Sequence, residues 1–328
     1  MQRQLWASQR RAPRSAHQNT ALLSTIDGPI DAVRLAAAFA AVVASSDVLR
    51  TRIHGDAVSI ADEVASTETL EMTRAATSQW AAERVRTPLN MADGGVDSVV
   101  ISHPDGTTSW YLNLHHVITD ATASAAVFTA TALAYHGAEI EVPSYYGWAQ
   151  ELLGPRDDAR TERSRKHWAA RTPLPPSGRL YEPVDDPSPA SVRAEVPLPG
   201  DGLAQRLESD YASLSDDLAW TGVMLTAAAV YLHRINGATE LSLGLPVHNR
   251  STPEAAAVFG PVMQVFPVDV SIEPDDSLRS LHKRVTKSAM QTIRNARPGL
   301  APSLTGIEAV VNIIPRAGIT EFGEHPVS

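Results

Sequence analysis

The feature that most constrains the fold of this chain is a proline-rich interval near its middle. Eight prolines lie between Pro173 and Pro199. Proline lacks a backbone N–H and clashes with the preceding helical turn, so this interval excludes a long helix or a central strand. Helix and strand patterns mix on both sides of it, and 328 residues are many for one compact core. We therefore predict an α/β (α+β) protein of two lobes, residues 1–172 and 200–328, joined by a connection over residues 173–199.

The elements expected in the first lobe follow from caps, periodicity and turn residues. Asp31 is a candidate helix N-cap before an apolar run, and the turn PDGT separates two strand patterns, which predicts a β-hairpin. A helix should begin at Ala121 and end near Gly137. The expected helices cover residues 32–44, 70–85 and 121–136, and the expected strands cover residues 49–53, 96–101 and 109–114.

The second half has the same mixture of patterns. Helices are expected over residues 218–235 and 277–294, and strands over residues 240–245, 262–272 and 309–314. No short internal repeat is visible, so the two halves are predicted as two separate α/β lobes.

Composition narrows the function classes. The chain has no cysteine, which excludes disulfides, thiolate nucleophiles and thiolate metal sites. Its formal net charge of −9 argues against general nucleic-acid binding. The N-terminus lacks the apolar core of a secretory signal, and no apolar run approaches the ~20 residues of a membrane span, so a cytoplasmic protein is expected.

The stretch WYLNLHHVITDATAS, residues 110–124, carries the main candidate chemistry. Side chains alternate faces along a strand, so adjacent His115 and His116 should have different surroundings, and only one should do chemistry. A neutral imidazole is the usual proton acceptor near pH 7. Asp120 stands at a predicted helix start, where it can cap the helix or pair with a distant arginine.

Plainer interpretations of this stretch stay open at this point. A histidine at a strand end is commonly a hydrogen-bonded structural residue, and geometry alone does not choose between the two rings. A metal site is disfavoured because adjacent strand residues diverge and no HExxH helix accompanies them. No GxSxG, GxGxxG or GxxxxGK motif is present, which disfavours a serine hydrolase and a nucleotide-binding protein.

Several segments together resemble one family. HHVITDA resembles the HHxxxDG motif of the condensation domains of non-ribosomal peptide synthetases, within the chloramphenicol-acetyltransferase-like acyltransferase superfamily. Six more stretches are similar to that family's sequence in the same order along nearly the whole chain: QRQLW, GPIDAVRLAAAFAAVVASSDVLRTRI, YYGWAQE, KHWAAR, LGLPVHNR and FGPVMQVFPVDV. This collinearity is more specific than any single motif.

The resemblance implies two acetyltransferase-like lobes in a V shape, with a tunnel where two carrier-protein phosphopantetheine arms meet. It implies amide bond formation between a carrier-bound acyl or peptidyl thioester and an acceptor amine, as in antibiotic and other natural-product biosynthesis. His116 would be the catalytic histidine, with His115 and Asp120 as further motif members and Arg50 as the ion-pair partner of Asp120. The implied partners are donor and acceptor carrier proteins and adenylation domains, and no bound cofactor or metal is expected.

Departures from the family pattern keep alternatives open. Ala121 replaces the motif glycine and could narrow the tunnel, while Gln4 and Gln264 replace an arginine and an asparagine. Asn312 lies on a predicted strand and could face the tunnel. The second lobe is expected to be truncated, without the segment that crosses back to the first lobe. An ester-forming acyltransferase with an alcohol acceptor, and a degenerate domain that only docks carriers, are the alternatives.

Overall fold

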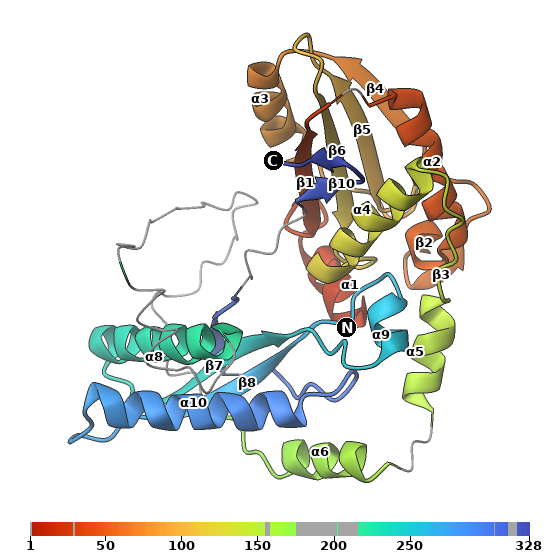
Figure 1. Cartoon of the computed structure of the whole chain (residues 1–328). Coiled ribbons are helices and arrows are strands. Elements are labelled where there is room, and N and C mark those ends of the chain that lie inside the picture. Colours follow the sequence, from red (N-terminus) through yellow and green to blue (C-terminus); the bar gives the residue numbers. More distant parts are fainter. Residues whose placement is uncertain are drawn as a thin grey trace.

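The structure is a computed structural model that describes residues 2–28, 30–154, 158–174, 202, 216–304, 306–313 and 320–328. Within them the chain forms two main sheets with helices packed on each, one in each half of the sequence, and two small two-stranded sheets, β2–β3 and β10–β11 (Figure 1). Two mixed helix-and-strand lobes were predicted, and this architecture confirms the fold class. The predicted connection, beyond residue 174, lies outside the described residues.

The first lobe is built on a four-stranded sheet in the order β1-β6-β5-β4. β6 is antiparallel to β1 and β5, and β4 is parallel to β5. The helices α2 and α4 cover one face of this sheet and α3 covers the other (Figure 1). Its elements are α1 (Gln2–Arg11), β1 (Asn19–Ile26), α2 (Ala32–Ser45), the 3-10 helix η1 (Val48–Arg50), β2 (Thr51–His54), β3 (Ala57–Ile60), β4 (Thr67–Glu71), α3 (Arg74–Arg84), β5 (Val96–Ser102), β6 (Thr108–His115) and α4 (Ala121–Tyr135).

Local sequence signals explain several of these boundaries. The Asp31 carboxylate accepts hydrogen bonds from the Val33 and Arg34 N–H groups, which confirms it as the N-cap of α2. The predicted hairpin is β5–β6. The helix expected over residues 70–85 is wrong at its start, because Leu70 lies on β4 and α3 begins only at Arg74. Parallel pairing with β5 determines the structure of this segment, and the local sequence pattern does not report that pairing.

The second lobe is a three-stranded sheet in the order β8-β7-β9. The helices α8 and α10 bury Leu225, Ala229, Leu281 and Val285 against its strands. Its elements are α8 (Asp216–Asn236), β7 (Glu240–Val247), α9 (Pro253–Ala257), β8 (Gln264–Ser271), α10 (Leu278–Asn295) and β9 (Ile307–Val310). Two further helices, α5 (Tyr145–Leu153) and α6 (Ala159–Ala169), lead from the first lobe to the second (Figure 1).

One helix corrects an expectation about apolar length. Residues Leu218–Asn236 of α8 are long and apolar enough for a membrane span by length and composition, whereas no such run was expected. In the structure, Leu225, Ala229 and Leu232 of this helix are buried in the second-lobe core, as in the core helix of a folded lobe.

The last residues correct the predicted lobe boundary. The hairpin of β10 (Glu321–Phe322) and β11 (His325–Pro326) lies on the first lobe, where Thr25 and Ser328 exchange backbone hydrogen bonds of 2.8 and 2.9 Å. Phe322 is fully buried and packs against the rings of Phe128 and Tyr135 on α4. A segment that crosses back to the first lobe was expected to be missing, and these contacts show one.

Candidate active site

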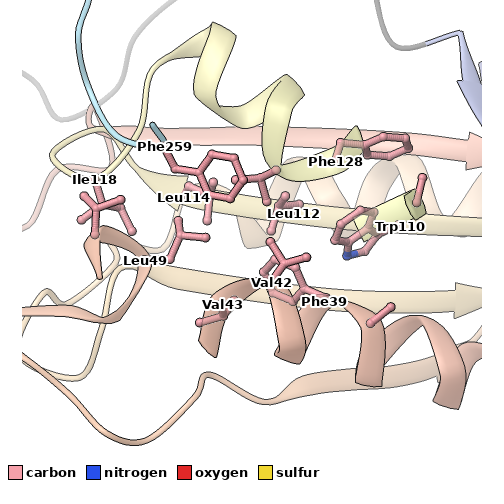
Figure 2. Close-up of a cluster of buried hydrophobic side chains, with 14 of the residues drawn as sticks. Phe39, Val42, Val43, Leu49, Trp110, Leu112, Leu114, Ile118, Phe128 and Phe259 are labelled. Atoms are coloured by element: carbon pink, nitrogen blue, oxygen red, sulfur yellow. The ribbon is translucent and has the colours of Figure 1, made fainter. Parts of the chain in front are cut away.

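The motif stretch starts on a strand that is buried on both faces. Every residue of β6 is buried, with Trp110, Leu112 and Leu114 packed against α2 and α4 in one core cluster (Figure 2). Tyr111 packs on the opposite face, against Trp80 of α3. The strand ends at His115, and residues 116–118 form a turn, where the motif leaves the sheet. A rigid strand therefore holds the start of the motif loop, residues 115–121.

His115 is sealed in the interior. Its side chain is fully buried, its backbone N–H donates to the Gly95 carbonyl at 2.8 Å, and its Nδ1 accepts from the Val117 N–H at 3.1 Å. Nε2 therefore carries the ring hydrogen, and it is buried with no hydrogen-bond partner among the described residues. Burial, with smaller contributions from His116 and His17, lowers the pKa of His115 to about 4. The ring is thus neutral at pH 7 and orders the turn.

His116 is in a different environment although it is the next residue. It lies in the turn and is half-buried, whereas the three residues on each side of it are buried. Its backbone N–H donates to the Gln18 carbonyl at 2.7 Å, and its Nδ1 lies 2.8 Å from the Thr119 carbonyl. A carbonyl oxygen only accepts, so Nδ1 carries the hydrogen and Nε2 keeps its lone pair. The Thr119 carbonyl therefore fixes the orientation of the ring and leaves Nε2 as the nitrogen that can accept a proton.

Asp120 closes the loop and is the most heavily bonded side chain of the motif. It is the N-cap of α4, accepting from the Ala123 N–H at 2.8 Å. Its other oxygen accepts from the backbone N–H groups of Val262 and Met263 at 2.8 and 3.0 Å. Both N–H groups belong to the second half of the chain. One carboxylate therefore joins the first lobe to the loop that precedes β8.

An arginine of the second half completes this contact. The Arg250 Nη2 lies 3.1 and 3.3 Å from the two Asp120 oxygens, and the two side chains are 5% and 1% exposed. Arg250 is itself oriented by three carbonyls, those of Ala255, Val258 and Gly260, each at 2.8 Å. A buried charge pair of this kind is stabilised when the remaining polar atoms are also bonded, and among the described residues only the Arg250 Nε of this pair has no partner. Asp120, Arg250 and these backbone partners are called the Asp120 hub below.

The predicted partner of Asp120, Arg50, is wrong. Arg50 instead donates to the carbonyls of Ser46 and Ala61, at 3.3 and 2.8 Å, and so holds η1 against the end of β3. The physical reason is local, because Arg50 lies beside those carbonyls whereas Arg250 comes from the loop that packs on the motif. The missed signal was Arg250, the last residue of LGLPVHNR, which lies three residues after the end of β7.

The loop between Arg250 and β8 packs closely against the first lobe and α5. Phe259 and Val262 are buried in the first-lobe core, and Figure 2 shows the Phe259 ring among Leu114, Ile118 and other side chains of that core. Gly260 has a φ of +107°, and a Cβ there would lie 2.6 Å from the Tyr145 ring, so only glycine fits. The Tyr145 hydroxyl donates to the Pro261 carbonyl at 3.0 Å. The two lobes are therefore joined by packing as well as by charge.

Two further predicted site residues are placed as follows. Ala121 is exposed at the first position of α4, and the one described non-glycine residue with a positive φ is Asn249, so alanine is unstrained at Ala121. The strand predicted over residues 309–314 ends at Val310 in the structure. Asn312 therefore lies two residues after β9, and its side chain is exposed. Among the described residues, no group of three His, Asp or Glu side chains could hold a metal ion.

A cavity of about 430 Å³ lies between the lobes next to the motif loop. We call it the interlobe cavity. Two of its lining residues bond the motif directly, since Gln2 donates to the Val117 carbonyl at 2.9 Å and the Val262 N–H donates to Asp120. His116 is not among its lining residues. The full lining comprises Gln2, Arg3, Gln4, Tyr145, Trp148, Ala149, Leu152, Pro261, Val262, Gln264, Pro298, Gly299 and Ala301.

Comparison with families and with curated proteins points in one direction. The family model described as "Condensation domain" matches residues 1–302. The chain is 25% identical to an isonitrile lipopeptide synthase of Streptomyces coeruleorubidus, over 89% of this chain and 21% of the relative. It is 24% identical to the phosphinothricin tripeptide synthetase PhsC of Streptomyces viridochromogenes, over 89% of this chain and 29% of the relative. The chain thus spans less than a third of either synthetase.

Solved structures agree at the level of the fold. The starter condensation domain of rhizomide synthetase RzmA superposes with a TM-score of 0.79 at 20% identity, covering 100% of this chain and 80% of that chain. The first condensation domain of the calcium-dependent antibiotic synthetase superposes with a TM-score of 0.74 at 19% identity, covering 100% and 82%. At such identities the likeness concerns the backbone arrangement.

Proposed function

Because this chain belongs to the condensation-domain family found in non-ribosomal peptide synthetases, we propose that it joins a carrier-bound acyl or peptidyl thioester to an acceptor amine. The observation that carries this proposal is the state of His116. Its ring is half-buried, its Nδ1 hydrogen is bonded to the Thr119 carbonyl, and its Nε2 has no partner among the described residues. That combination suits a group that exchanges protons with a substrate.

The chemistry asked of His116 is modest. An α-amine has a pKa near 8, so part of it is already neutral at pH 7. The neutral amine attacks the thioester carbonyl, a C–N bond forms, and the C–S bond then breaks. Nε2 accepts the proton that the amine loses, and that proton can pass to the departing thiolate. Positioned base catalysis of this kind contributes about 10²–10⁴-fold, and orientation of the amine adds to it.

The surrounding residues are proposed to position this ring. Asp120 and His115 are motif members that act through the loop, since both are buried and bonded to protein groups. The backbone at Ala121 does not require glycine, so this departure does not deform the motif. The intact geometry favours a catalytic domain over one that only docks carriers.

The proposal includes partners that the relatives suggest. Both thioester and amine would arrive on the phosphopantetheine arms of donor and acceptor carrier proteins, with adenylation domains loading the carriers in the cytoplasm. The chain spans only a part of the synthetases it resembles, so these partners are inferred from the family's chemistry. An ester-forming reaction with an alcohol acceptor remains the alternative outcome of the test.

The test is a condensation assay with the purified chain. A donor carrier loaded with an acyl group is mixed with an aminoacyl acceptor or with a hydroxyacyl acceptor, and intact-protein mass spectrometry follows the transfer. We expect the acyl group to appear on the amine acceptor, at a rate that depends on the protein. Transfer to the hydroxyl acceptor alone would support the ester-forming alternative, and transfer to neither would contradict the proposal.

A further inference from the structure

The interlobe cavity is lined by a glutamine, Gln264, whose amide oxygen is hydrogen-bonded and whose amide nitrogen is not. Gln264, the first residue of β8, is 6% exposed and lines the cavity. Its Oε1 accepts a hydrogen bond of 2.7 Å from the Gly299 N–H. A backbone N–H requires an acceptor, so this bond places the amide oxygen against Gly299 and leaves Nε2 as the free end.

The free end of this amide is unpaired. No hydrogen bond to Nε2 exists among the described residues, and this atom is not one of the fully buried atoms that lack a partner, although Gln264 as a whole is only 6% exposed. A donor that faces accessible space in a cavity can be taken up by water or by a ligand. Because Gln264 and its partner Gly299 both line the cavity, a ligand there can take this bond.

The rest of the lining limits the chemistry of that ligand. Its walls are largely apolar, formed by Tyr145, Trp148, Leu152 and Val262 among others, and the lining contains no carboxylate. The other donor side chains of the lining are Gln2, Arg3 and Gln4, all on α1, and Gln2 already donates to the Val117 carbonyl. Donors set in apolar walls suit a chain that carries hydrogen-bond-accepting carbonyl groups.

We propose that Gln264 is a positioning residue whose Nε2 donates a hydrogen bond to a carbonyl oxygen of an amide-bearing chain held in the interlobe cavity. The inference rests on the proposed function for the identity of that chain, since a pantetheine arm contains two amide carbonyls. The cavity is next to the chemistry, because Val262 in its wall is bonded to Asp120 and Gln2 is bonded to Val117. A bond made there would fix how far the arm advances toward the motif loop.

The length of the side chain is part of this proposal. Gln264 stands where the resembling family motif has asparagine. Asparagine is one methylene shorter, so from the same backbone position it cannot both reach the Gly299 N–H and extend its NH₂ to the same point in the cavity. Gln264→Asn should therefore weaken ligand binding without adding a charge.

The experiment measures binding without turnover. Pantetheine is titrated into the full chain and followed by ligand-observed NMR, for wild type, Gln264→Glu, Gln264→Asn and Gln150→Glu. Glutamate keeps the acceptor for Gly299 but removes the donor, so we expect its dissociation constant to rise about tenfold or more, and that of Gln264→Asn about threefold. Gln150→Glu is the matched control, because it places the same charge on an exposed position of α5 outside the lining, and it should bind as wild type does.

The outcomes separate this inference from the proposed function. Pantetheine binding that is undetectable in the wild type, or equal in Gln264→Glu and wild type, would overturn the role of Gln264. Thermal melting of each variant shows that it is folded, and Gln264→Asn provides a second, uncharged variant if the glutamate disturbs β8. If pantetheine binds as expected while the condensation assay yields no amide, the proposed reaction fails and the binding role stands.

Discussion

The two ends of the motif loop differ more than their spacing of four residues suggests. At one end, His116 is half-buried, bonded on one ring nitrogen and free on the other. At the other end, Asp120 is 1% exposed and bonded to an arginine and three backbone N–H groups. The comparison separates two roles within one motif. An unsatisfied, accessible nitrogen suits proton transfer, whereas a fully bonded buried carboxylate suits holding two lobes together.

The largest expected effect is on turnover at the open end. His116→Ala removes the proton acceptor, so the rate of amide formation should fall by about 10²–10⁴-fold. The free energy of unfolding should change little, because the ring is half-buried and loses a single hydrogen bond, to the Thr119 carbonyl. Quenched-flow assays with loaded carriers measure the rate, and urea denaturation measures stability. A variant that keeps the wild-type rate would show that His116 has no chemical role.

The next largest effect is expected on the free energy of unfolding, through the contacts of Asp120. Arg250→Met leaves the Asp120 carboxylate buried without its counter-ion, which typically costs about 3–5 kcal/mol. Arg50→Met, by contrast, removes hydrogen bonds to two carbonyls, and a loss of about 1–2 kcal/mol is expected. Chemical denaturation of both variants compares the two arginines directly. Equal losses would remove the distinction between the Asp120 hub and the contacts of Arg50.

Acid is expected to lower the free energy of unfolding through His115, the buried residue next to His116. Burial lowers the pKa of His115 from 6.5 to about 4. Between these values the unfolded chain binds a proton that the folded chain does not, so the free energy of unfolding falls as the pH falls. The full cost, reached near pH 4, is about 3 kcal/mol. It is absent above pH 6.5, where the ring is neutral in both states.

The measurement for this effect is denaturation at several pH values between 7 and 4. Wild type is compared with His115→Asn, which retains a polar side chain but does not titrate. The variant should be less stable at pH 7, because its packing changes, yet its stability should fall less steeply with acid. Identical pH dependence in both proteins would show that His115 does not contribute to acid sensitivity.

The smallest effect is expected at Ala121, the residue directly after Asp120. Ala121→Gly restores the glycine of the family motif at the first residue of α4. Glycine in a helix costs about 0.5–1 kcal/mol relative to alanine, and less at a first position, so a small loss of stability is expected. Turnover should remain close to wild type, since the backbone there is already unstrained. A large gain in turnover would indicate that the alanine methyl group obstructs the substrate.

Sequence reasoning succeeded where the signal is local. The cap at Asp31, the hairpin β5–β6 and the start of α4 after Asp120 all depend on residues within a few positions of one another. The family resemblance was also inferred from short local motifs, and the matching family model confirms it. The chemical roles of His115 and His116 stay predictions. The two rings do have different surroundings, but the reason is that β6 ends at His115 and His116 lies in the following turn, rather than alternation along one strand.

Sequence reasoning failed where the structure depends on contacts between residues that are far apart in the sequence. Arg250 lies 130 positions after Asp120, and only the folded loop shows that it, not Arg50, completes the pair. Phe322 reaches α4 from the end of the chain, which no pattern near residue 322 reports. The segment around Leu70 forms β4 because β5 offers it a parallel partner. In each case tertiary pairing decided between local alternatives.

The most direct test measures rate and stability together in two variants, His116→Ala and Arg250→Met. Both are assayed for single-turnover amide formation and for the free energy of unfolding under the same buffer conditions. We expect His116→Ala to lose its rate while it keeps wild-type stability, and Arg250→Met to lose several kcal/mol of stability. If His116→Ala instead lost stability as Arg250→Met does, with no rate effect beyond unfolding, the division of the motif into a chemical end and a structural end would be contradicted.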